Sequence, residues 1–324
     1  REGFLTVGEA PGITPARNEH ITDPENGELD MLFLFEHLDA DCEDNTKWKP
    51  TKLELPKLKE ILNGQQNAVS KAGWASLFFD NHDQPRIVSR WGDDSTKETR
   101  KASAKALALL LHMHRGTPYI YEGEELGMTN AHFTKLEQYR DLEALNGYRQ
   151  RVEEAKCQSS ESMMAALALI GRDNARTPMQ WDASKYAGFT APDAPVEPWI
   201  SVNPNHVEIN AAEEFDDPES VYTFYKKLIA MRHNSATIAA GEWHLLAADD
   251  EQVYAFTRVD GDDTILVAVN LTDRSAALPL DVAELLSDGV NESQVLLSTY
   301  DAMHSVKSIA HGELARWEGV VIQL

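Results

Sequence analysis

The sequence predicts an α/β fold in which four parallel strands form half of an eight-stranded (β/α)8 barrel, followed by a small antiparallel β domain. Three observations lead to this prediction. Short apolar runs alternate with helical patterns in the first third, the middle is polar and irregular, and strand-like runs dominate after about residue 238. Strand–helix–strand alternation implies a parallel sheet with right-handed crossovers.

The predicted parallel strands are four short apolar runs bounded by polar or turn-forming residues. They comprise residues 4–7, 31–35, 74–79 and 118–121. Runs of this kind are typical of strands buried on both faces of a sheet. We therefore expect four core strands, the first of which starts almost at residue 1.

Two segments between these runs have the apolar spacing of helices that pack on a sheet. In residues 95–114, Ser95 and Glu98 form a capping-box pattern, and Gly116 is expected to end the helix as a left-handed cap. The apolar positions are Leu55, Leu58, Ile61 and Leu62 in residues 55–69, and Ala102, Ala106, Leu109, Leu110 and Met113 in residues 95–114.

Residues 129–217 form a long polar insertion with a helical stretch near 136–155. Insertions after barrel strands commonly shape the substrate entrance. Asp217 followed by Pro218 then predicts the start of another helix, whose apolar face includes Phe224 and Leu228. We place the first domain at residues 1–237.

The second domain is predicted at residues 238–324. Residues 253–259 and 264–269 are strand-like, and residues 261–263 between them are typical of a hairpin loop. Residues 295–297 and 320–324 are further candidate strands. We expect no group of charged residues in this domain to be catalytic.

The composition limits the class of partner. The net charge is −23, from 30 basic and 53 acidic residues, which argues against nucleic acid and anionic membranes as partners. No apolar run approaches the roughly 18 residues that span a membrane. Cys42 and Cys157 lack metal-ligand spacing, and we expect two free thiols, a soluble cytoplasmic protein and no bound metal.

Two acidic residues follow predicted strands and are candidates for paired chemistry. Glu9 ends the first strand and precedes a rigid Ala-Pro-Gly turn, while Asp83 lies in a polar turn that Pro85 holds outside any sheet ladder. Pairs of carboxyl groups are the catalytic groups of most glycoside hydrolases. We predict that Glu9 and Asp83 face each other across one sugar-sized cleft.

The motifs around these residues resemble those of glycoside hydrolase family thirteen, the α-amylase family. Residues 79–83 (Phe-Asp-Asn-His-Asp) resemble its fourth signature region and residues 7–9 (Val-Gly-Glu) its third. The resemblance implies that the four strands are barrel strands five to eight. Further segments, 116–128, 171–181, 188–190 and 198–200, are similar to the subgroup that contains oligo-1,6-glucosidases, dextran glucosidases, trehalose-6-phosphate hydrolases and sucrose isomerases.

The resemblance implies a role for each matching residue. Glu9 would be the general acid and then base, and Asp83 the second carboxylate, which stabilises the distorted sugar. His82 would hydrogen-bond the same sugar, and Arg172 would recognise its non-reducing end. The role of Arg176 stays open: this residue could belong to the site or form a structural ion pair.

Other residues are expected to be structural. Trp181 and Trp199 lie in polar loops, where they would staple the loop to the core rather than stack on sugars. Glu124 and Glu125 are expected to cap structure near the fourth strand. His112 has no metal-ligand spacing and is expected to pack within a helix.

The resemblance implies a retaining α-glucosidase that hydrolyses short α-linked gluco-oligosaccharides, with α-1,6 bonds favoured, from the non-reducing end. Trehalose-6-phosphate hydrolase and sucrose isomerase are alternatives within the family. An alternative of another class is a non-catalytic, transporter-associated binding relative. Glu9, His82 and Asp83 occurring together argue against that last alternative.

The resemblance also implies what the 324 residues lack. The family's nucleophile is an Asp in its second region, which precedes the third, and no Gly-Phe-Arg-x-Asp pattern occurs here. The nucleophile and any calcium loop would therefore lie upstream, in an N-terminal half of the same polypeptide. No cofactor is expected within the chain itself.

We expect these residues alone neither to form a stable monomer nor to hydrolyse glycosides, because half a barrel leaves two open sheet edges. Purification followed by an assay with a nitrophenyl α-glucoside checks this expectation. Turnover would refute it.

Overall fold

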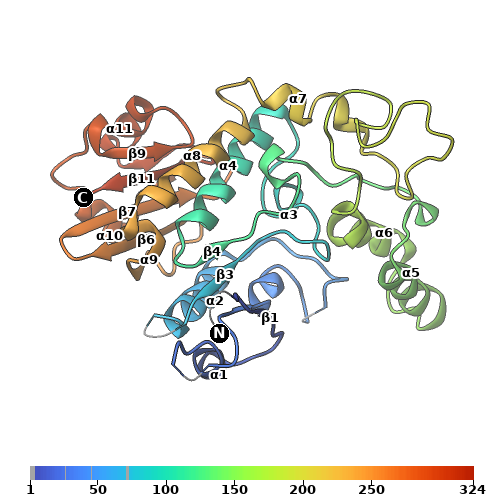
Figure 1. Cartoon of the computed structure of the whole chain (residues 1–324), viewed down its shortest axis with the longest axis horizontal. Helices are drawn as coiled ribbons and strands as arrows, with labels where there is room; N and C mark the ends of the chain where they lie inside the picture. The colour runs from blue at the N-terminus through green and yellow to red at the C-terminus, as the bar shows by residue number, and fades with distance from the viewer. Residues whose placement is uncertain (1–3, 26, 45, 71–72) are drawn as a thin grey trace.

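Four parallel strands form the first sheet of the computed structural model, which describes residues 4–25, 27–44, 46–70 and 73–324 (Figure 1). Val7 pairs with Met31, and Ser76 with Thr117, so the strands lie in chain order with a common direction. The predicted parallel sheet is confirmed. Its strands are β1 (Val7–Glu9), β2 (Met31–Phe33), β3 (Ala75–Leu77) and β4 (Thr117–Pro118).

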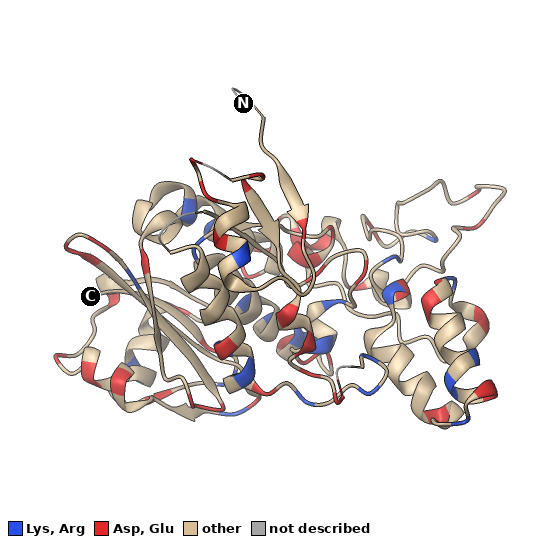
Figure 2. Ribbon diagram, turned by 90° about the horizontal axis from the view of Figure 1, so that it is seen from below, with Lys and Arg blue, Asp and Glu red and all other residues tan. Residues whose placement is uncertain are grey.

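The prediction of a buried first strand at residues 4–7 is wrong. β1 begins at Val7, and the side chains of Phe4 and Leu5 are 80% and 66% exposed. The chain leading into β1 extends away from the rest of the ribbon (Figure 2). Within the described residues β1 has a neighbouring strand on one side only, so little covers its apolar side chains.

The helix predicted at residues 55–69 is confirmed, since it begins at Leu55, whereas the helix predicted at residues 95–114 begins later. The long helix α4 (Lys97–Met113) is capped by Thr96, whose hydroxyl accepts a hydrogen bond from the backbone N–H of Thr99. The predicted Ser95–Glu98 box is wrong because the Ser95 N–H donates to Asp93 instead. The other helices here are α1 (Pro15–Ile21), α2 (Leu55–Ala68) and α3 (Ile87–Arg90).

Gly116 is not the cap of α4, contrary to the prediction. The helix ends at Met113, and His114 after it is extended. Gly116 has a φ of +140°, and a Cβ there would lie 2.5 Å from the carbonyl oxygen of Ala75. A glycine is therefore required where the chain passes close to β3 on entering β4.

The polar insertion contains more helix than predicted. One helical stretch was expected near 136–155. The structure has three elements there: a short 3-10 turn (Leu136–Gln138), the helix α5 (Leu142–Tyr148) and a wider π-helical turn (Arg149–Glu154). A further helix, α6 (Ser160–Ile170), was not predicted, because apolar residues surround much of its circumference and leave no clear period. Both helices project to one side of the molecule (Figure 1).

The helix α8 (Val221–Asn234) packs beside α4 (Figure 1). It starts after Ser220, whose side chain accepts a hydrogen bond from the N–H of Thr223. The predicted start at Asp217 is wrong, because that carboxylate binds Lys101 and the backbone of Glu219 instead. Two short helices flank α8, namely α7 (Ala211–Glu214) and α9 (Ala236–Ala240).

The C-terminal part is built on a five-stranded antiparallel sheet with the order β5-β6-β7-β11-β9. The predicted hairpin is confirmed, since Asp260 pairs with Asp263 across a turn in which Gly261 has a φ of +61°. The strand β5 was not predicted. The elements are β5 (Glu242–Leu246), β6 (Val253–Asp260), β7 (Asp263–Asn270), β9 (Val295–Ser298), β11 (Gly319–Gln323), the small ribbon of β8 (Ala276–Ala277) and β10 (Glu313–Leu314), and the helices α10 (Leu280–Leu285) and α11 (Ala302–Ala310).

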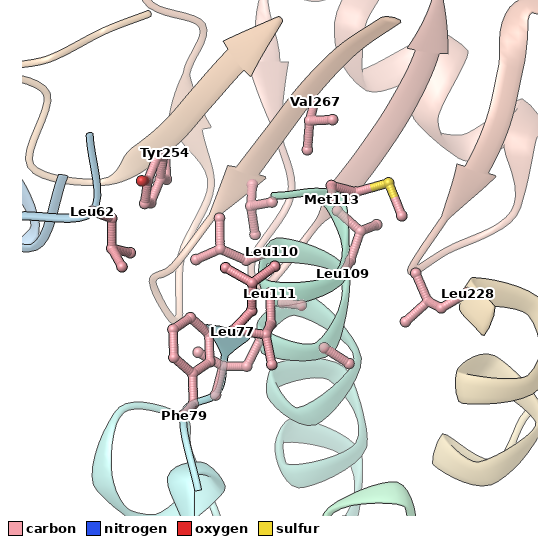
Figure 3. Packing of buried hydrophobic residues seen from close by; sticks show 14 of the residues in the cluster. Leu62, Leu77, Phe79, Leu109, Leu110, Leu111, Met113, Leu228, Tyr254 and Val267 are labelled. Atoms are coloured by element: carbon pink, nitrogen blue, oxygen red, sulfur yellow. The ribbon is translucent and has the colours of Figure 1, made fainter. Parts of the chain in front are cut away.

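The main hydrophobic core lies around α4. Leu109, Leu110 and Met113 are fully buried within one cluster that also contains Leu77 of the first sheet and Val267 of the second (Figure 3). The same helix therefore packs against elements of both sheets. None of the helices in the described part of the chain is long and apolar enough to cross a membrane.

A buried polar contact also joins α4 to the second sheet. The His114 ring stacks on Trp243, with 4.6 Å between ring centroids, and lies 3.1 Å from the Tyr254 hydroxyl. Burial lowers the pKa of His114 to about 3 and that of His112 to about 4. Both histidines are therefore neutral in the folded protein over the physiological range.

Replacing Leu109 by Ala should lower the free energy of unfolding by about 2–5 kcal/mol, because it leaves a cavity in the core. Urea denaturation of the folded chain, in the oligomeric state that it adopts in solution, measures this change. Leu280→Ala is the matched control: Leu280 is 84% exposed, and we expect a change within about 0.5 kcal/mol. Equal effects of the two substitutions would contradict the core described above.

The low pKa of His114 predicts a specific pH dependence. An unfolded histidine takes up a proton below about pH 6.5 and the buried one does not, so its contribution to stability is complete above that pH and is lost as pH falls. The cost of His114→Phe should therefore be smaller at pH 5 than at pH 7, by about 2 kcal/mol.

Urea denaturation at the two pH values measures the cost. His233 is exposed, so the control His233→Phe should cost the same at both. An unchanged cost for His114→Phe would contradict the lowered pKa of His114 in the folded protein.

Candidate active site

A cavity of about 270 Å³ lies at the carboxyl ends of the four parallel strands. Carboxyl ends of parallel strands meet at one edge of a sheet, which is where side chains from separate strands converge. Each strand or the loop directly after it contributes to the cavity wall. The lining residues are Glu9, Phe33, Phe35, Phe78, Asp80, Asn81, His82, Tyr119, Ile120 and Tyr121.

Glu9 is the last residue of β1, and its side chain is exposed. Among the described residues no partner forms a hydrogen bond or ion pair with the Glu9 carboxyl group. The neighbouring wall is aromatic: Phe33 contacts both Tyr119 and Phe78, with centroid distances of 4.6 and 5.4 Å. The carboxyl group of Glu9 is therefore accessible from the cavity.

The polar turn after β3 carries His82 and Asp83. The side-chain oxygen of Asn81 accepts a hydrogen bond from the Asp83 N–H at 2.7 Å, which stabilises the turn. His82 lines the cavity with Glu9, and its Nε2 lies 3.6 Å from an Asp83 carboxylate oxygen. Asp83 itself lies beside the cavity, so its position opposite Glu9 stays a prediction.

Two arginines from the polar insertion hold Asp83. Arg176 binds the turn twice: Nη2 lies 2.8 Å from Asp83, and Nε donates to the carbonyl oxygen of His82 at 2.8 Å. Arg172 lies 3.4 Å from Asp83 and 2.7 Å from Glu143 of α5. Sequence reasoning left the role of Arg176 open, and the structure places it against the candidate site.

The arginines belong to a larger network of paired charges. Lys47, from the loop after β2, binds Glu143, and burial lowers the pKa of Lys47. Arg176 also contacts Asp141 at 3.4 Å and the buried Asp173 at 3.8 Å. Each of the three cations in this network therefore faces at least one carboxylate. Asp and Glu positions also occur in many other parts of the ribbon (Figure 2).

Sequence reasoning did not predict that two carboxyl groups near the cavity, those of Asp80 and Glu124, are buried. Asp80 was read only as part of the motif, yet burial raises its pKa to about 7. Glu124 is also buried, and burial together with the nearby Asp80 raises its pKa well above the usual range. Glu124 accepts a hydrogen bond from the Tyr121 N–H, as its expected capping role requires. The only signal in the sequence was the apolar run Leu77-Phe78-Phe79 directly before Asp80.

The exposed tryptophans do not staple their loops to the core, contrary to prediction. Trp181 is 50% and Trp199 62% exposed, because the loops that carry them run over the surface. Among the described residues no group of three or more His, Cys, Asp or Glu side chains is arranged to hold a metal ion.

Comparison with known families matches nearly the whole chain. The family described as Alpha amylase, catalytic domain, matches residues 1–241, and Maltogenic Amylase, C-terminal domain, matches residues 243–290. The chain is similar to the oligo-1,6-glucosidase of Parageobacillus thermoglucosidasius, with 42% identity over 321 residues. This match covers 99% of the chain and 55% of that relative. The trehalose-6-phosphate hydrolase of Bacillus subtilis is 40% identical over the same shares of the two chains.

Solved structures show the same similarity. The Bacillus licheniformis trehalose-6-phosphate hydrolase superimposes with a TM-score of 0.86 at 40% identity, covering 98% of this chain and 56% of that one. The isomaltulose synthase of Klebsiella sp. LX3 has a TM-score of 0.87 at 34% identity, covering 98% and 55%. The chain thus spans about half the length of the relatives it matches.

Removing Arg176 should destabilise the site, because Asp83, Asp141 and Asp173 would lose a shared cation. We expect Arg176→Ala to lower the free energy of unfolding by about 1.5–3 kcal/mol in urea denaturation. The control is Arg149→Ala, which breaks an exposed pair with Glu154 and should change stability by less than about 0.5 kcal/mol. Equal effects would mean that the Arg176 contacts do not support the turn.

Proposed function

This chain belongs to the α-amylase family of glycoside hydrolases, and we propose that it carries the acid/base side of the active site of a retaining α-glucosidase. The substrate is a short α-linked gluco-oligosaccharide, with an α-1,6 bond, attacked from its non-reducing end. One observation carries this proposal: Glu9 and His82 line a single cavity of about 270 Å³, and Asp83 lies beside it. The relatives at about 42% identity named oligo-1,6-glucosidase support it.

The proposed reaction has two displacements. A carboxylate nucleophile attacks the anomeric carbon while the glycosidic C–O bond breaks, and Glu9 gives its proton to the leaving oxygen. The Glu9 carboxylate then takes a proton from water, which attacks the same carbon and releases the nucleophile. Asp83 and His82 bind hydroxyls of the distorted sugar, and Arg172 contacts its non-reducing end.

We assign the nucleophile to a part of the protein outside these 324 residues, so the chain alone is inactive. In this assignment the four strands are strands five to eight of a (β/α)8 barrel in a domain of residues 1–237. Residues 129–217 border the substrate entrance, and residues 238–324 form the C-terminal β domain. The start of the antiparallel sheet at Glu242 supports that division.

The charges near the cavity favour a neutral sugar over a phosphorylated one. A phosphate group needs cationic groups that are free to bind it. Lys47, Arg172 and Arg176 each face a carboxylate, and four carboxylates oppose these three cations. This argues against the trehalose-6-phosphate hydrolase alternative, although a relative with that name is 40% identical.

The purified chain should not hydrolyse a nitrophenyl α-glucoside. Turnover should appear when the part of the Parageobacillus thermoglucosidasius relative that has no counterpart here is fused before residue 1. Proton NMR should show α-glucose as the first product, since two displacements retain configuration. β-Glucose as the first product would contradict a retaining mechanism.

In that fusion, Glu9→Gln should lower kcat by about 10²–10⁴-fold, because the leaving oxygen would lose its proton donor. Glu98→Gln, on the exposed side of α4, is the control and should leave kcat unchanged. If Glu9→Gln kept full activity, the acid/base assignment would be wrong.

A further inference from the structure

Asn130, at the start of the polar insertion, is a fully buried asparagine that the reaction described above does not use. Its Oδ1 accepts a hydrogen bond from the backbone N–H of Arg86 at 3.0 Å. Its Nδ2 donates to the carbonyl oxygens of Ala168 at 3.1 Å and Leu169 at 2.7 Å. One short side chain therefore joins two segments that are far apart in the sequence.

The need for an asparagine follows from the groups that it joins. Ala168 and Leu169 lie in the last turn of α6, where the backbone carbonyl groups lack partners within the helix. Arg86 directly precedes α3 and is itself fully buried, so its backbone N–H needs an acceptor. An amide side chain supplies a donor and an acceptor together and satisfies both segments.

Each of the two joined segments leads directly to the charges around Asp83. Arg86 ends residues 81–86, the turn that carries Asp83. Residues 171–176, which directly follow α6, carry the two arginines that bind this carboxylate. Asn130 therefore links the backbone that carries the carboxylate to the backbone that carries both cations.

Two further hydrogen bonds reinforce this link. The residue after Asn130, Ala131, donates its backbone N–H to Oδ1 of Asn174 at 3.2 Å. The Nη2 group of Arg86 donates to the carbonyl oxygen of Ala175 at 3.2 Å. Together with the bonds of Asn130 they form a closed ring of contacts, so neither segment can shift without breaking one of them.

The contacts of Asp83 depend on this spacing. Arg176 Nη2 lies 2.8 Å from the Asp83 carboxylate, and its Nε donates to the carbonyl oxygen of His82 at 2.8 Å. Hydrogen bonds weaken steeply when their distance and angle depart from the optimum. A shift of either segment would therefore release the carboxylate from Arg176 and leave it free to rotate.

We propose that Asn130 is a positioning residue that fixes the spacing between Asp83 and the arginines of residues 171–176, and thereby the orientation of the Asp83 carboxylate. Asn130 acts on the reaction only through Asp83. This effect on the reaction rests on the proposed function, which assigns Asp83 to the distorted sugar. The spacing itself rests only on hydrogen bonds between described residues.

NMR of the purified chain tests the spacing through the Nε–H resonance of Arg176, because this group donates to the turn at His82. Asn130→Asp keeps the size of the side chain and its acceptor, but it sets a carboxylate oxygen against the carbonyl oxygens of α6. We expect this variant to shift or broaden the Arg176 resonance, which is assigned by its loss in Arg176→Lys.

Asn270→Asp is the matched control. Asn270 is also fully buried, and its Nδ2 donates to three backbone carbonyl oxygens in the C-terminal part. This substitution should therefore lower stability by the same mechanism and leave the Arg176 resonance unchanged. An equal shift in the two variants, or no shift in Asn130→Asp, would overturn the proposal.

If Asn130→Asp does not fold, Asn130→Ser provides the test without introducing a buried charge. The serine hydroxyl is too short to reach both Arg86 and α6, so the Arg176 resonance should again shift. An unchanged resonance in Asn130→Ser would also overturn the proposal.

Steady-state kinetics of the fusion described above separate positioning from a loss of stability. A misplaced Asp83 carboxylate should lower kcat by about 10–100-fold and change KM little, because it is assigned to the distorted sugar. Asn270→Asp should leave both constants unchanged at a temperature at which both variants are folded. A raised KM with an unchanged kcat in Asn130→Asp would contradict action through Asp83. A fusion that is inactive without any substitution would count against the proposed function instead, and the Arg176 resonance would still decide the spacing.

Discussion

Burial of α4 (Lys97–Met113) is the constraint on which the rest of the structure depends. Nearly every side chain in its second half is buried, in contact with the parallel sheet, with α8 and with the antiparallel sheet. Apolar burial of this extent is the dominant favourable term in folding. Because α4 packs against both sheets, the strands that end at the candidate site and the C-terminal sheet share one hydrophobic core.

The candidate site, in contrast, depends on charge compensation rather than on apolar contact. Asp83 lies on a short turn, and two guanidinium groups from a distant insertion hold it in place. Exposed ion pairs contribute little, but partly buried pairs in a network lose much more when one member is removed. The insertion therefore contributes to the stability of the site, because it supplies Arg172 and Arg176.

Local structure was predicted well where the local sequence permits few alternative conformations. The hairpin at residues 253–270 has two strands rich in apolar residues and a turn that begins with Gly261, and these features can be identified without tertiary context. Helix ends were predicted less well, because Ser95, Thr96 and Asp217 are all acceptable caps and packing chooses among them. The helix α6 has too few polar positions to show a period, and the exposure of β1 follows from its place at a sheet edge.

The sequence by itself determined the family and the residue types at the carboxyl ends of the strands, because motifs such as Phe-Asp-Asn-His-Asp are contiguous and chemically specific. Only the tertiary structure decided which charges meet. The pairing of Arg176 with Asp83 joins segments far apart in the chain. The physical reason is that the state of a carboxyl group depends on its burial and on charges within a few ångströms, and neither quantity is encoded by its neighbours in sequence.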